Sequence, residues 1–134
     1  MKADLPANIV EDVAIAIALM GETPEVKSWT VYVINLKDTP ITNVMITSKG
    51  YGEKDGKQVK TSLLRHFIGD LAPKSFAGVE AIDTQVFGLT NEYWLSYYMG
   101  KDIFDKKFIF LPESIVEGNM IKIPLVNKPG VMIK

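Results

Sequence analysis

Residues 13–19 alternate strictly between large aliphatic side chains and alanines, and this alternation limits the possible folds more than any other feature of the sequence. In a β-strand, Val13, Ile15, Ile17 and Leu19 would lie on one face and the intervening alanines on the other, because successive side chains point to opposite faces. A helix is the alternative, since alanine favours helices. The strict period of two favours the strand.

The same period of two, in β-branched and aromatic residues, recurs along the chain between groups of turn residues. Residues 53–57 form a polar hairpin tip, because Asp55-Gly56 is a strong hairpin signal. Residues 100–105 read as a turn, and residues 112–119 as a loop or a single helical turn. The expected strands are residues 13–19, 29–36, 41–48, 59–68, 76–82, 86–89, 91–99, 106–111, 120–126 and 131–133.

For two of these segments, the sequence also predicts the position of the strand within its sheet. Residues 106–111 carry apolar side chains on both faces, which predicts a central strand. Residues 120–126 contain Pro124, which predicts an edge strand. Short strands at this spacing, without a long helix, predict an all-β fold. We expect one domain over residues 1–134, an immunoglobulin-like β-sandwich of about seven to eight strands.

Composition excludes several classes of function. The chain has 134 residues and no cysteine, so disulfide frameworks, thiolate metal sites and thiol nucleophiles are absent. The formal net charge is −1, and Arg65 is the only arginine among 15 basic residues. Nucleic-acid readers rely on arginine for bidentate contacts to phosphate and guanine. We therefore expect no nucleic-acid partner.

The apolar run at residues 13–20 could be mistaken for a signal peptide. A signal peptide has a positive region directly before its apolar stretch, whereas Asp4, Glu11 and Asp12 precede this one. The run is also too short to span a bilayer. We expect folded structure here, no membrane partner and a cytoplasmic protein.

Three stretches resemble bacterial immunoglobulin-like domains of the cell-adhesion-related type. They are residues 31–35, a strand that ends at Asn35 before a charged turn, residues 41–46, and residues 70–75, which lead into an apolar strand. Lys74 stands where that family usually has glycine. The resemblance covers roughly residues 31–82 and implies the sandwich fold. It implies no particular function, because sandwich folds carry many unrelated roles.

The whole chain also resembles a group of short bacterial proteins of unknown function, some of which bear the name phenylalanyl-tRNA synthetase alpha subunit. A class II synthetase holds ATP and the acyl-adenylate with arginines in at least two separated motifs. Arg65 alone cannot supply both, and the chain is too short for that catalytic domain.

The sequence holds few residues suited to catalysis. His66 is the only histidine, and no serine lies in a nucleophile-elbow pattern, so His66 reads as a strand residue beside Arg65, with a hydrolase as the weakest alternative. The carboxylate pairs are Glu11 with Asp12, Glu80 with Asp83, and Glu113 with Glu117, and each reads as surface charge. No phosphate loop, metal ligand set or cofactor motif is present, so we expect no cofactor.

Aromatic residues are concentrated between residues 93 and 110. If Tyr93, Leu95 and Tyr97 face the core, Trp94 and Tyr98 face outward, where an exposed pair needs a partner or a covering loop or lysine stem. We expect a non-catalytic binding or assembly module that contacts a protein, or itself as a homodimer. The alternative is a carbohydrate or small-ligand binder. The candidate binding residues are Trp94, Tyr98, Arg65 and His66.

Overall fold

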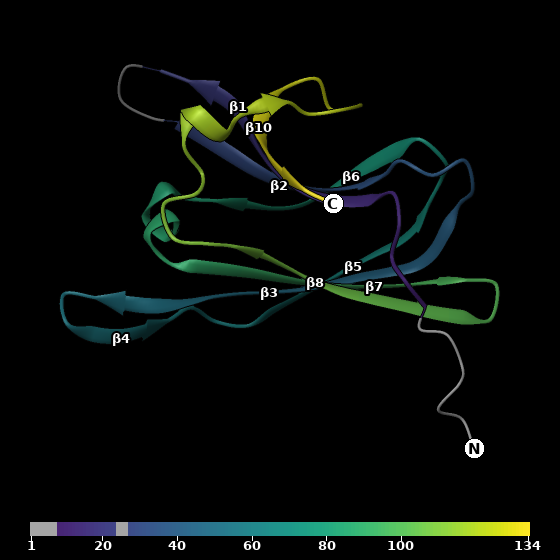
Figure 1. Ribbon diagram of the computed structural model, residues 1–134, viewed down its shortest axis with the longest axis horizontal. Helices are drawn as coiled ribbons and strands as arrows, with labels where there is room; N and C mark the ends of the chain where they lie inside the picture. Colours follow the sequence, from purple (N-terminus) through teal and green to yellow (C-terminus); the bar gives the residue numbers. More distant parts are fainter. Residues whose placement is uncertain (1–7, 24–26) are drawn as a thin grey trace.

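The chain folds into two five-stranded β-sheets that face each other, visible as the upper and lower layers of Figure 1. The computed structural model describes residues 8–23 and 27–134. Sheet A runs in the order β6 (Ser75–Ile82), β2 (Lys27–Asn35), β1 (Val13–Glu22), β10 (Pro129–Ile133) and β9 (Ile121–Lys122). Sheet B runs in the order β4 (Lys57–Lys60), β3 (Ile41–Lys54), β7 (Thr90–Met99) and β8 (Asp102–Phe110), and β5 (Leu64–Leu71) also pairs with β3.

This architecture confirms the predicted all-β sandwich, with more strands than the expected seven to eight. One strand is added where the sequence reads as one continuous segment. The pattern predicts a single strand over residues 59–68, but β4 ends at Lys60 and β5 begins at Leu64. The predicted hairpin tip is confirmed, since Asp55 and Gly56 both have positive φ and Lys54 pairs with Lys57.

The main core lies between the inner faces of the two sheets. From sheet A, Val13, Ile15 and Ile17 point into it, as the alternation predicts. From sheet B, Tyr93 and Leu95 point into it and are almost fully buried. The burial of these large side chains is the main stabilising term of the fold.

Sheet A is covered on its other face as well. Ala14, Ala16 and Ala18 are fully buried there, against Ile34 of β2 and Ile123 of the segment that follows β9. Alanine leaves room for that segment to approach the sheet closely. Only Ile121–Lys122 of the expected strand 120–126 pairs, although it does lie at a sheet edge as predicted.

The prediction of a strand over residues 86–89 is wrong. These residues belong largely to the short 3-10 helix η1 (Thr84–Gly88), because the side chain of Asp83 accepts a hydrogen bond from Gln85 N and caps it. A second 3-10 turn, η2 (Glu117–Asn119), lies within the expected loop or helical turn.

The predicted placement of residues 106–111 is also wrong, because β8 is an edge strand of sheet B rather than a central one. It starts at Asp102, inside the expected turn at residues 100–105. Its apolar residues lie on both faces for different reasons. Phe108 and Phe110 are buried in the core, whereas Ile103 and Ile109 are exposed on the outside.

Gly130 allows the close approach of β10 to β1. A Cβ atom at this position would lie 2.8 Å from Cα of Ala18 and closer still to the carbonyl oxygen of Ile17. Both obstacles are backbone atoms of a central strand and cannot move aside.

We predict that Gly130→Ala lowers the free energy of unfolding by about 3 kcal/mol, measured by urea denaturation. Gly118→Ala is the control, because nothing lies within 4 Å of its Cβ position, and it should change stability by less than about 0.5 kcal/mol.

Candidate functional site

The four candidate binding residues predicted from the sequence lie on two different faces of sheet B. Trp94, Tyr98 and Arg65 lie on the outer face, where Arg65 and Trp94 flank Thr47 in the same cross-strand row. His66, the next residue along β5, points the other way, toward the inner side of the sheet. The structure therefore groups three of the candidates and separates the fourth.

The outer face of sheet B is unusually apolar for a solvent-facing surface. Six large apolar side chains lie on it with exposed fractions between 38% and 66%. They come from every long strand of the sheet, so they form a band across it rather than isolated exposures. Its members are Met45, Phe67, Trp94, Tyr98, Ile103 and Ile109. We call this set the outer apolar face.

Sequence reasoning missed four members of this face: Met45, Phe67, Ile103 and Ile109. The signal for Phe67 was available, because Arg65 and Phe67 are two residues apart on one strand and must share a face. Ile103 was missed because residues 100–105 read as a turn, and Ile109 was missed because a central position for residues 106–111 would have covered it.

Trp94 is held in place by two residues of the neighbouring strand β8. Lys107 Nζ lies 4.8 Å from the centre of the indole ring, and the indole Nε1 donates to Asp105 Oδ2 at 3.3 Å. A lysine thus covers part of the ring, one of the possibilities that the sequence left open. A sugar that stacks on Trp94 would compete with this lysine, which weakens the carbohydrate alternative.

The edge strand β8 has no strand partner on its outer side among the described residues. Asn8 Nδ2 donates to the carbonyl oxygen of Ile103 at 2.8 Å, near the start of this edge. The rest of the strand carries three consecutive charged residues, 105–107, followed by the apolar residues 108–110. An open edge of this length is a template for pairing with another strand.

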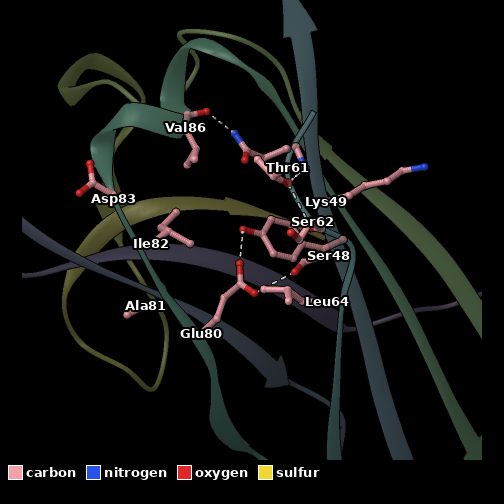
Figure 2. Close-up of a pocket in the computed structure, with 13 residues that line it drawn as sticks. Ser48, Lys49, Thr61, Ser62, Leu64, Glu80, Ala81, Ile82, Asp83 and Val86 are labelled. Carbon is pink, nitrogen blue, oxygen red and sulfur yellow. Dashed lines mark hydrogen bonds between the residues drawn. The ribbon is translucent and has the colours of Figure 1, made fainter. Parts of the chain in front are cut away.

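His66 belongs to a polar cluster on the inner side, centred on Glu80 of β6. Glu80 Oε1 lies 2.7 Å from His66 Nε2 and accepts a hydrogen bond from Ser48 Oγ at 2.8 Å. Its other oxygen, Oε2, accepts from Tyr93 Oη at 3.4 Å. Figure 2 shows the Glu80 carboxylate beside the hydroxyl group of Ser48. The cluster joins three strands of sheet B to the edge of sheet A.

This geometry differs from that of a hydrolytic triad. A nucleophilic serine gives its proton to histidine, which a carboxylate orients from the other side. Here Ser48 and His66 both contact the carboxylate of Glu80, so the serine proton points at Glu80. The arrangement is that of a partly buried carboxylate satisfied by its donors.

The cluster lines one wall of a cavity of about 320 Å³ between β6 and the residues around Thr61. Figure 2 shows Asp83 and Ser62 on opposite sides of this space. Glu80 and Asp83, a carboxylate pair in the sequence, both line it but have separate roles. Glu80 holds the polar cluster together, whereas Asp83 caps η1.

Comparisons with known proteins do not place the chain in a family. No protein-family model, no curated protein and no solved structure matches the chain. In the described ranges 8–23 and 27–134, no three His, Asp or Glu side chains gather in a way that could hold a metal ion. The same residues include no helix with the length and hydropathy of a membrane span.

Tyr93 is a sensitive probe of the Glu80 cluster. Burial, followed by the charge of Glu80 and the hydrogen bond to it, raises the pKa of Tyr93 well above its ordinary value of 10.0. The unfolded chain therefore loses this proton first as pH rises. Stability is unaffected by this group below about pH 10 and falls above it.

We predict that the free energy of unfolding decreases as pH rises above about 10, by up to about 1.4 kcal/mol per pH unit from Tyr93. In Tyr93→Phe this decrease should be shallower, whereas in Tyr98→Phe, which leaves the Glu80 cluster intact, it should match the parent protein. Denaturant titrations at a series of pH values from about 8 to about 11.5 measure how the free energy of unfolding changes with pH in each protein. An unchanged slope in Tyr93→Phe would contradict the assignment.

Proposed function

We propose that this chain is a non-catalytic assembly module that pairs with a second copy of itself through the free edge of β8. The observation that carries the proposal is the self-complementary sequence of that edge. The chain, moreover, offers an open strand beside the outer apolar face. Both features are typical of surfaces that contact a protein.

Two-fold symmetry restricts how β8 can pair with its copy. A two-fold axis perpendicular to a sheet keeps the outer face of both copies on the same side, so the register must be symmetric about one residue. Symmetry about Lys106 places apolar residues opposite apolar residues at positions 103, 104, 108 and 109, and opposite charges at positions 105 and 107. The opposed pairs are Ile103 with Ile109, Phe104 with Phe108, and Asp105 with Lys107.

Each of these pairs occurs twice in the dimer. Ile103 and Ile109 are both exposed in the single chain, and the pairing would bring them together on the outer face. Asp105 and Lys107 would form two inter-chain ion pairs on the same face. Each symmetric register sets one charged residue opposite its own copy, namely Asp105, Lys106 or Lys107. Only the register about Lys106 also pairs Asp105 with Lys107 and Ile103 with Ile109, so this register is favoured.

Lys106 is the one residue that would face its own copy. Its Nζ lies 5.1 Å from the centre of the Phe108 ring of the same chain, which gives the ammonium group a partner within its own copy. The pairing would extend sheet B across two chains. It would also place the two outer apolar faces, each with its Trp94, on one continuous surface.

Charge reversal tests this pairing directly. We predict that Asp105→Lys and Lys107→Asp each weaken dimerisation on the order of 100-fold, because each sets like charges opposite one another twice. An equimolar mixture of the two variants should form heterodimers. One chain then carries lysine at positions 105 and 107 and the other carries aspartate at both, so each inter-chain pair joins opposite charges. Sedimentation velocity and light scattering over a range of concentrations measure the state of each sample.

Lys54→Asp is the matched control, because it makes the same charge change as Lys107→Asp at the tip of the β3–β4 hairpin, and it should dimerise like the parent. A parent chain that stays monomeric at every concentration would refute the proposal. A parent dimer that both variants leave intact, or a mixture that stays monomeric, would show that β8 is not the interface.

A further inference from the structure

The proposed pairing of β8 would double the size of the outer apolar face. The large side chains of this face are each roughly half exposed in the single chain. Together they offer on the order of 600 Å² of accessible surface, near the upper limit for the largest apolar patch of a typical monomer. Pairing through β8 would join two such faces into one patch of about 1,200 Å².

This doubling matters because a stable interface between proteins covers about 800 Å² on each partner. The outer apolar face of one chain falls short of that area, whereas the joined face of a β8 pair exceeds it. A joined face left in water would also keep a large apolar area hydrated, which is unfavourable. The joined face therefore has enough area to bind a partner stably, and covering it lowers the free energy.

The charges on this face suit a second copy of the same surface. Lys49 and Glu92 form an ion pair with 3.6 Å between Nζ and Oε2, and Asp105 and Lys107 would pair between the two β8 strands. Arg65 lies on β5, on the side of the sheet away from β8, where it can stay at the polar rim of an interface. Since these charges are mixed in sign, the face fits its own copy better than a strongly acidic or basic partner.

We propose that two β8-paired dimers pack with their outer apolar faces against each other and form a tetramer. This inference rests on the proposed function, because only the joined face has the area that a stable contact needs. Sheets that pack face to face lie about 10 Å apart with interdigitating side chains. In that contact the exposed rings of Phe67 and Trp94 would be covered by the opposite dimer.

Symmetry makes this tetramer a closed assembly. The two-fold axis of the β8 pair is perpendicular to the sheet, and the face-to-face contact adds two-fold axes that run parallel to it. Together these axes give D2 symmetry. Each chain then has its β8 edge paired and its outer apolar face covered, so neither surface is left to bind a further chain.

Phe67→Glu separates the two contacts. Phe67 is the most exposed member of the face, and β3 and β7 lie between its strand and β8. The variant should dimerise like the parent, whereas the association of dimers should weaken at least about 100-fold, because each chain would bury an unpaired charge. Phe76→Glu, at a partly exposed phenylalanine of sheet A, is the matched control and should form tetramers. Sedimentation equilibrium over a range of concentrations measures both steps.

Tryptophan fluorescence gives an independent signal. The chain has two tryptophans, of which Trp29 is buried and Trp94 is partly exposed on the outer apolar face. As the parent concentration rises, emission should move to shorter wavelength in step with tetramer formation, because Trp94 leaves water. In Phe67→Glu the emission should not shift over the same concentrations.

Four results would contradict this account, and they separate its two parts. A parent that stops at the dimer would overturn the tetramer and leave the β8 pairing intact, with the face free for a different partner. Tetramers that Phe67→Glu leaves intact, or species larger than the tetramer, would also overturn it. A parent that stays monomeric would refute the proposed function itself. If Asp105→Lys still associates and adding Phe67→Glu abolishes that association, the dependence on β8 is wrong.

Discussion

The side-chain amide of Asn35 holds together two of the four places where the chain passes between the sheets. Its Nδ2 donates to the carbonyl oxygens of Thr39, Leu71 and Ala72, and its Oδ1 accepts from the backbone N–H of Lys37. The first passage leads from β2 to β3 and the second from β5 to β6. Lys74 N also donates to Lys37 O, with Lys74 in the left-handed conformation that favours glycine. The spacing of the two sheets, and with it the position of Glu80 opposite His66, depends on this fully buried residue.

Burial is distributed unequally between the sheets, and this explains where a contact surface can lie. Sheet A is covered on one face by sheet B and on the other by the segment around Ile123. Sheet B is covered only on its inner face by the described residues, so its apolar outer residues remain exposed. The exposure of Trp94 and Phe67, together with the open edge of β8, gives the surface that we assign to assembly.

Features set by neighbouring residues were predictable from the sequence. The alternation in β1, the Asp55-Gly56 turn and the opposite directions of Tyr93 and Trp94 are all local, because the side-chain period of a strand determines them. Features set by strand order were not. The edge position of β8 and the contact of His66 with Glu80, which join separate strands and sheets, depend on pairing that periodicity does not encode. The capping of η1 by Asp83 overrode the strand pattern at Val86.

The free edge of β8 is the surface through which we propose that the chain assembles. Hydrogen–deuterium exchange of the β8 backbone amides at low and high protein concentration tests this most directly, because pairing with a second copy protects amides that face solvent in the single chain. We expect exchange to slow with rising concentration at the β8 amides that point away from β7. Exchange in β4, at the opposite edge of sheet B, should stay constant. Equal exchange rates along β8 at both concentrations would contradict assembly through this edge.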